Sequence, residues 1–302
     1  MRKLAIALGA VVVLLSPLST AESAEAAPAT TPHDIVYYQT QYDNGSYVSP
    51  LALTQNNTGV TDVIVAAIHL DSDGSVHLND NPPSDPMFTQ MWADLHTMQS
   101  QGVNVLAMVG GAAQGSFQNL DNNFDTYYPL LKNLITTYNL NGLDLDVEEN
   151  MSQAGIERLV NQLYSDFGPS FLITLAPVGT ALSGGGNLSG FSYDQLYADC
   201  GNEISWFNAQ LYNGWGEMSD TSSYDSIIAH GVVPASKVVA GTTTNPDNGS
   251  GYVDMPTLRA TISSLAAKYP DFAGVDGWEY FNSEPGGTAA PWEWAADVHS
   301  AL

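Results

Sequence analysis

The sequence is poor in cysteine. Cys200 is the only one among 302 residues, so no intrachain disulfide can form. A lone cysteine of this kind is typical of a buried, unreactive position, and we do not expect it to act as a nucleophile. The fold must instead be held together by a hydrophobic core, for which the hydrophobic content of 44% is ample.

Basic residues are also scarce. Seven Lys and Arg stand against 32 Asp and Glu, which gives a formal net charge of −25 at pH 7. Such a field repels nucleic acid and anionic membranes, so we expect neither as a partner, and it favours a neutral or cationic ligand. A stronger interpretation than a preference for such a ligand is that the acidic residues keep an exported protein soluble in acid or salt. We expect the protein to be a monomer.

Long apolar runs are missing except at the N-terminus. There, Arg2 and Lys3 precede an apolar run to about Leu18, and the A-x-A motif at 24–26 follows. The run is short for a membrane span and ends at a cleavage motif, which predicts a secretion signal peptide over 1–26. The mature chain, 27–302, is then expected to be soluble, secreted and extracellular.

Short apolar runs alternate with amphipathic stretches along the mature chain. Eight runs are rich in Val, Ile and Leu without clean polar alternation, at 34–42, 60–70, 103–111, 140–149, 171–178, 204–213, 237–245 and 272–281. This composition is typical of parallel strands covered on both faces. Helical patterns lie between them, at 85–102, 124–140, 152–168, 192–200, 223–231, 255–270 and 291–302.

This alternation predicts an α/β fold, a (β/α)8 TIM barrel forming a single domain without a large insertion. A doubly wound open sheet is the alternative, but the Gly-rich phosphate loop expected after its first strand is missing. The segment 43–59 is weakly patterned. In the first strand, Tyr37 and Tyr38 have opposite parity, so only one can face inward, and the sequence does not choose between them.

The stretch "NGLDLDVEEN" (141–150) places acidic residues at every second position of a predicted strand. Residues two apart share a face, so Asp144, Asp146 and Glu148 should point into the barrel while the apolar residues between them face the helices. Active sites of barrels lie at the carboxyl ends of the strands. Glu148 is therefore expected at the mouth with the two aspartates beneath it, and Glu149 should face elsewhere.

Three carboxyl groups side by side in a buried strand cannot all remain ionised. At least one proton must be shared, which suits a general acid at Glu148 supported by an Asp pair. A calcium loop is one alternative, but it would need Gly where Glu149 stands. A solvated acidic turn is another, and the interleaved leucines argue against it. The six histidines show no metal-ligand spacing, and we expect neither a metal nor a cofactor.

The stretch "NGLDLDVE" resembles the D-G-x-D-x-D-x-E signature of glycoside hydrolase family 18, with Asn141 in the first Asp position and Val147 where many chitinases carry Trp. Further stretches resemble family motifs on the expected strands: "MVGG" (108–111), with Met108 for Ser, "LAPV" (175–178), "QLYN" (210–213) and "GWEYF" (277–281). The resemblance spans the mature chain and implies a barrel that hydrolyses glycosides by a retaining, substrate-assisted mechanism.

The resemblance also implies roles for individual residues. Glu148 would protonate the leaving oxygen, and the 2-acetamido oxygen of the substrate would attack the anomeric carbon. Asp146 would hold the acetamido N–H, and Asp144 would share a proton with Asp146. Tyr212 would orient the acetamido carbonyl. The remaining site residues would bind the sugar: Gln210 and Asn213 beside Tyr212, Trp278 as the hydrophobic floor, and Gly110 and Gly111 in the third βα loop.

Some of these residues have plainer interpretations. Trp278 could be ordinary barrel core, and Gln210 could be structural. The Gly-rich stretch 110–117 lacks the lysine of a phosphate-binding loop, so we interpret it as close backbone packing near the sugar.

The substrate classes in this family are chitin, the chitobiose core of N-glycans, and sugars bound without cleavage by lectin-like members. The presence of Glu148 disfavours a lectin. The gap 246–255 after the seventh strand leaves no room for the inserted domain that deepens the groove of many processive chitinases. We expect an open cleft and endo cleavage of chitin or chito-oligosaccharides, favoured by the Q-x-Y-N similarity. An endo-β-N-acetylglucosaminidase acting on N-glycans is the alternative.

Overall fold

The computed structural model describes Met1 and residues 32–302. Apart from Met1, the predicted signal peptide (1–26) lies outside the described residues, and it stays a prediction. Within residues 32–302 no helix is long and apolar enough to cross a membrane.

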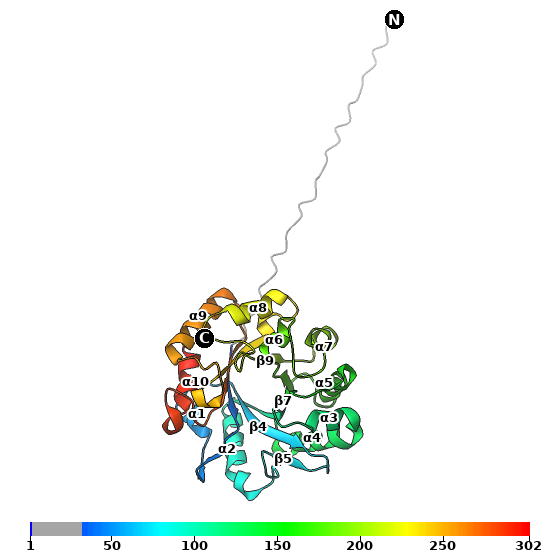
Figure 1. Ribbon diagram of the computed structural model, residues 1–302, viewed down its shortest axis with the longest axis vertical. Helices are drawn as coiled ribbons and strands as arrows, with labels where there is room; N and C mark the ends of the chain where they lie inside the picture. The colour runs from blue at the N-terminus through cyan, green and yellow to red at the C-terminus, as the bar shows by residue number, and fades with distance from the viewer. Residues whose placement is uncertain (2–31) are drawn as a thin grey trace.

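The described residues form a closed barrel of eight parallel strands, surrounded by helices (Figure 1). The strands of the barrel are β1 (His33–Tyr38), β4 (Asp62–Leu70), β6 (Asn104–Gly110), β7 (Gly142–Asp146), β8 (Leu172–Leu175), β9 (Trp206–Gln210), β10 (Val238–Thr243) and β11 (Gly274–Trp278). The ring closes because β1 pairs with both β11 and β4. The predicted TIM barrel is confirmed, and each of the eight predicted runs contains one strand.

The ten described helices surround the ring in Figure 1. They are α1 (Leu51–Gln55), α2 (Thr89–Ser100), α3 (Ser116–Asn122), α4 (Phe124–Tyr138), α5 (Gln153–Phe167), α6 (Gly179–Leu182), α7 (Tyr193–Cys200), α8 (Ser222–His230), α9 (Met255–Lys268) and α10 (Trp292–His299). Single 3-10 turns are η1 (Pro86–Phe88), η2 (Ala235–Lys237), η3 (Pro246–Asn248) and η4 (Gly287–Ala289).

Several short elements were not predicted from the sequence. The weakly patterned segment after β1 contains a small hairpin of β2 (Tyr42–Asp43) and β3 (Ser46–Tyr47). A third strand, β5 (Val76–Leu78), pairs antiparallel with the end of β4. The helices α3 and α6 were also missed, because seven and four residues are too few to show a helical period.

The barrel strands bury both faces, which is why their sequences lack polar alternation. One core lies between the strands and the helices, and a smaller one fills the barrel interior. In β1, Tyr37 belongs to the interior core and Tyr38 to the outer one. The Tyr38 hydroxyl donates a hydrogen bond to the Val48 carbonyl at 2.6 Å. The question that the sequence left open is therefore answered in favour of Tyr37 facing inward.

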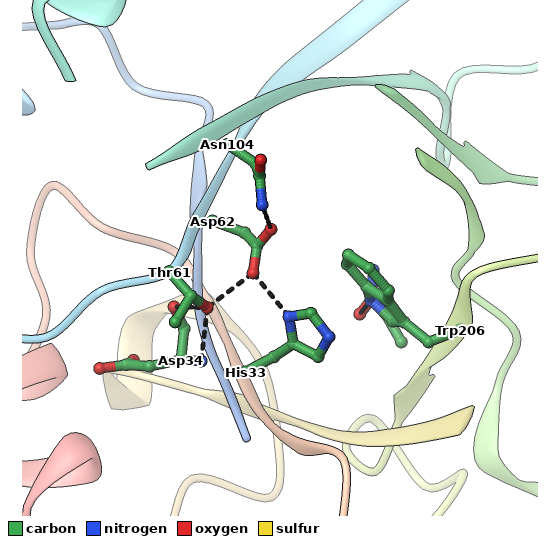
Figure 2. A network of polar contacts seen from close by, with 7 residues as sticks. His33, Asp34, Thr61, Asp62, Asn104 and Trp206 are labelled. Carbon is green, nitrogen blue, oxygen red and sulfur yellow. Dashed lines mark hydrogen bonds and ion pairs between the residues drawn. The ribbon is translucent and has the colours of Figure 1, made fainter. Parts of the chain in front are cut away.

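A polar cluster occupies the end of the barrel where the strands begin (Figure 2). The Asp62 carboxylate accepts hydrogen bonds from Thr61 Oγ1 at 2.6 Å and Asn104 Nδ2 at 2.8 Å. Its Oδ2 also lies 2.7 Å from His33 Nδ1. The ring of Trp206 covers His33, with centroids 4.0 Å apart. Both carboxylate oxygens of Asp62 therefore have hydrogen-bond partners, although the residue is buried.

Asp34 stands in contrast to this cluster. Its side chain is fully buried and points away from Asp62 in Figure 2, and neither carboxyl oxygen has a hydrogen-bond partner among the described residues. Burial, with a smaller contribution from the charge of Asp62, raises the pKa of Asp34 well above its usual range. A buried carboxyl without partners is costly when ionised, so this group is a source of instability at neutral pH.

We predict that Asp34→Asn stabilises the fold at neutral pH. The pKa of Asp34 is higher in the folded state than its unfolded value of about 3.9. The contribution of this carboxyl to the stability of the fold is therefore fully present below about pH 3.9 and is lost as the pH rises through the folded-state pKa. Asn does not titrate, so the variant should gain about 2–4 °C in Tm at pH 7 and little or nothing at pH 3.5. Thermal unfolding at both pH values measures this, and an equal shift at both would contradict it.

Candidate active site

A pocket of about 420 Å³ opens at the carboxyl ends of the barrel strands. Eight of the nine predicted site residues line it: Gly110, Gly111, Asp146, Glu148, Gln210, Tyr212, Asn213 and Trp278. The ninth, Asp144, lies beneath the pocket and is fully buried. The sequence thus identified residues from four strands and their loops that the fold brings together at one end of the barrel.

Three carboxyl groups follow β7 from the interior of the barrel to its mouth. Asp144 is 0% exposed, Asp146 is 6% exposed, and Glu148, two residues beyond the end of the strand, is partly open to solvent. The residues between them belong to the outer core. Glu149 faces away, and its carboxylate accepts backbone hydrogen bonds at the start of α3, from Gly115 and Phe117 at 2.8 Å each. Glu149 therefore fixes a loop and does not enter the pocket.

Asp144 is surrounded by neutral donors. Its Oδ1 accepts from Thr174 Oγ1 at 2.6 Å and from Asn208 Nδ2 at 3.0 Å, and its Oδ2 accepts from the Tyr37 hydroxyl at 2.8 Å. Burial raises the pKa of Asp144, and these three hydrogen bonds act in the opposite direction. Because the donors stabilise the charged form, Asp144 is the buried carboxyl best able to carry a negative charge.

Asp146 has fewer partners. Within residues 32–302 the only hydrogen bond to its carboxyl group comes from Gln210 Nε2, 3.1 Å from Oδ1. Burial raises the pKa of Asp146 well above its usual range, and the charges of Glu148 and Asp144 raise it further. No hydrogen bond joins Asp144 to Asp146 within residues 32–302, so the two are coupled through their charges. Asp146 is accordingly less able to carry a negative charge than Asp144.

Gln210 connects the upper two carboxyl groups. Its Nε2 donates to Asp146 Oδ1, to Glu148 Oε1 at 3.3 Å and to the Ala176 carbonyl at 2.9 Å. A neutral amide donor between two acids lowers their repulsion without adding a charge. Gln210 is therefore both structural and part of the site, so the two interpretations of this residue are not exclusive.

Two glycines allow β6 to approach β7 at the pocket. Gly110 has φ +92°, and a Cβ there would lie 2.5 Å from the Asp146 carbonyl oxygen. Gly111 has φ +83°, and its N–H donates to that same oxygen at 2.9 Å. Both positive φ angles and the close approach require glycine. The pair therefore fixes the backbone that carries Asp146.

Tyr37 was not chosen from the sequence, yet it is part of the site. In addition to its bond to Asp144, its ring lies 5.5 Å from that of Trp278. Tyr212 is 7% exposed and lines the pocket, and the amide oxygen of Asn213 accepts from the Ser250 backbone N–H at 2.8 Å. Asn213 thus anchors the loop after β10 as well as lining the pocket.

A fourth interior carboxyl, Asp276, was missed altogether. It lies on β11, is 2% exposed, and its Oδ2 has no hydrogen-bond partner within residues 32–302. Burial and the charge of Asp144 raise the pKa of Asp276 well above its usual range. Gly241 on the neighbouring strand gives it room, because a Cβ there would lie 2.9 Å from Asp276 Oδ1. The sequence did contain a signal for Asp276: it stands two residues before Trp278 in the same strand, so the two side chains share the face that points into the barrel.

Within residues 32–302 no group of three or more His, Cys, Asp and Glu side chains is arranged to hold a metal ion. The pocket brings together carboxyl groups of unequal burial, between which protons can be exchanged. Glu148, partly open to solvent, stands at the mouth, and Asp146, whose pKa is raised by burial, lies below it.

The comparisons with known proteins agree with this geometry. Residues 34–247 match the model of the family "Glycosyl hydrolases family 18". A solved fungal endo-β-N-acetylglucosaminidase from that family is 49% identical, with a TM-score of 0.87 over 90% of this chain and 99% of that one. Chitinase ChiC from Aspergillus fumigatus is 48% identical, with a TM-score of 0.82 over 88% and 98%.

The curated relatives are more distant, and several of them are longer than this chain. Chitinase 2 of Rhizopus oligosporus is 30% identical over 208 residues, which is 62% of this chain and 36% of that protein. This chain thus spans little more than a third of that relative's length. The family model covers well over half of the chain. The chain therefore belongs to glycosyl hydrolase family 18, and it is a glycoside hydrolase.

Proposed function

We propose that this enzyme hydrolyses the β-1,4 bond between N-acetylglucosamine units, in chitin or chito-oligosaccharides, by endo cleavage with retention of configuration. The observation that carries the proposal is the vertical arrangement of Glu148 above Asp146, with Gln210 bonded to both. This arrangement places a carboxyl group that is partly open to solvent at the mouth, and beneath it a buried one held by the Gln210 amide. We further propose that the mature chain is secreted and acts as a monomer.

In the first step, Glu148 transfers its proton to the glycosidic oxygen as that bond breaks. The acetamido oxygen of the substrate attacks the anomeric carbon, which gives a cyclic oxazolinium ion. Asp146 accepts a hydrogen bond from the acetamido N–H and, as positive charge develops there, passes its proton to Asp144. Tyr37, Thr174 and Asn208 donate hydrogen bonds to Asp144, and these bonds can rearrange when Asp144 takes up the proton.

In the second step, the ionised Glu148 takes a proton from water, which attacks the anomeric carbon and opens the oxazolinium ring. Tyr212 orients the acetamido carbonyl, and Gln210 and Asn213 line the same subsite. The partly exposed face of Trp278 supports the pyranose ring, as aromatic faces do. The glycines at 110 and 111 keep the backbone close to Asp146 on the opposite side.

A second substrate, the chitobiose core of N-glycans, contains the same sugar–sugar bond. It is supported by the 49% identity to a fungal endo-β-N-acetylglucosaminidase, and chitin is supported by 48% identity to ChiC and by the curated chitinases. Both candidates use the same acid and the same substrate-derived nucleophile. They differ only in what is attached to the two sugars.

We predict that Glu148→Gln lowers kcat on an N-acetylglucosamine oligosaccharide by at least about 100-fold, because the general acid is lost while the shape is kept. Glu149→Gln is the matched control. It removes the same charge one residue away and weakens the cap of α3, so it should lower Tm and leave hydrolysis largely intact. Steady-state kinetics and thermal unfolding measure both effects. A comparable loss of activity in the two variants would show that strand parity does not identify the acid.

The substrate class can be determined directly. Incubation with chitohexaose and, separately, with a high-mannose glycoprotein should give products from chitohexaose, resolved by mass spectrometry. Cleavage of the glycoprotein alone would replace chitin by N-glycans as the substrate. Binding without turnover of either would contradict the hydrolase assignment of the pocket.

Thiazoline analogues of the oxazolinium ion should inhibit competitively. An analogue of the cyclic intermediate is expected to bind at least about 100-fold more tightly than an oligosaccharide of the same length. An inhibition constant no lower than the KM of that oligosaccharide would argue against participation of the acetamido group.

A further inference from the structure

A second pocket opens beside the catalytic one. Its volume is about 860 Å³, and its lining includes His69, His77 and Asp80; we call it the histidine-lined pocket. Both pockets are lined by Gln39, His69 and Ala113, so these three residues stand on the boundary between them. The lining is dominated by side chains that can hydrogen-bond to hydroxyl groups, which suits further sugar units of a substrate held at Glu148.

Gln39 belongs to the turn at 39–41, which follows β1 and contributes to the boundary between the pockets. Glu279, directly after β11, holds this turn with both carboxylate oxygens. Oε2 accepts from the backbone N–H groups of Gln39 and Thr40, at 3.1 and 2.8 Å, and Oε1 accepts from Thr40 Oγ1 at 2.7 Å. Glu279 and Gln39 are 240 positions apart in the chain. Glu279 is only 6% exposed, so its charge depends on these donors.

The same turn is held from the other side by Asn79, which follows β5. Its Nδ2 donates to the Gln39 carbonyl at 3.0 Å and to Gln41 Oε1 at 2.9 Å. The Gln41 amide in turn donates to the carbonyls of Tyr38 and Ala66, at 3.0 and 3.1 Å. The turn is therefore fixed between the first two and the last barrel strands, before any substrate is present.

A purely structural role for Glu279 would be to join β11 to β1. That junction already exists, because the two strands share a continuous parallel ladder from His33 to Val36. The carboxylate adds no contact to this ladder and acts only on the turn beyond it. Its specific effect is to hold the polar backbone and side chain of Gln39 at the boundary of the two pockets.

We propose that Glu279 is a positioning residue for substrate binding: it fixes the wall between the catalytic pocket and the histidine-lined pocket, so that sugar units reaching beyond the cleaved pair are bound in the second pocket. This inference rests on the proposed function, since it assigns the second pocket to the same substrate. Glu279 does not touch the reacting atoms. Its effect therefore falls on the binding of long substrates and leaves the chemical step unchanged.

The test compares a short and a long substrate in Glu279→Gln. The short one is chitobiose with a fluorogenic leaving group, and the long one is whichever of chitohexaose or a high-mannose glycan the wild type cleaves. The amide of Gln removes the negative charge: its oxygen can still accept from the two backbone N–H groups and its N–H₂ group can donate to the Thr40 hydroxyl, but these bonds are then neutral and weaker than the charge-assisted bonds of the carboxylate. KM for the long substrate should rise about tenfold, with kcat and the short substrate changed by less than about twofold, since 1.4 kcal/mol is tenfold in affinity.

Two further variants make the result specific. Thr40→Val removes only the bond to Oε1 and keeps both backbone donors, so it should raise KM for the long substrate by a smaller factor. Glu284→Gln, the same change in the loop after β11 at a residue that lines neither pocket, should leave both substrates unaffected. Repeating the comparison by calorimetric binding in a Glu148→Gln background makes the test independent of turnover.

Equal changes in KM for short and long substrates in Glu279→Gln, or a fall in Tm with no change in either KM, would overturn the proposal. Failure of the proposed function has a different signature. In that case the wild type cleaves neither substrate, and the Glu148→Gln variant does not bind the short one. Both results would be the same whatever residue stands at position 279.

Discussion

Repulsion between carboxyl groups inside a closed barrel is the constraint around which the site is built. Four of them, Asp144, Asp146, Glu148 and Asp276, lie in or above an interior that excludes water. They cannot all be ionised, so each has a different environment: three donors for Asp144, one shared amide for Asp146, and contact with solvent for Glu148. Unequal burial along one segment thus gives different environments to three carboxyl groups that have nearly identical side chains.

The surroundings of these acids come from distant parts of the chain. Glycines in β6 bring the backbone against Asp146, and Gln210 reaches across from β9. The wall of the pocket is formed where β1 and β11 meet, with Glu279 holding the turn after β1. The acids themselves belong to one segment, whereas the shape of the cavity around them depends on the closure of the ring.

Sequence reasoning succeeded where the signal is local. The barrel strands were found because buried parallel strands are apolar without interruption, and Asp144, Asp146 and Glu148 were placed by their two-residue spacing. It failed where a role depends on a tertiary partner. Glu279 shows no sequence sign of its bonds to a turn 240 positions away. The choice between Tyr37 and Tyr38 needed the position of Asp144, and the short helix α3 depends on capping by Glu149 rather than on periodicity.

The closure of the barrel by its first and last strands also orders events during biosynthesis. During synthesis β1 leaves the ribosome long before Glu279 does. Until Glu279 has emerged, the turn at 39–41 is held by Asn79 alone. The carboxyl groups on and after β7 also depend on this late step. Their different degrees of burial arise only when β11 pairs with β1 and closes the barrel. A nascent or truncated chain therefore has the residues for catalysis without the environment that makes them different, and activity can arise only after synthesis has passed the eighth strand.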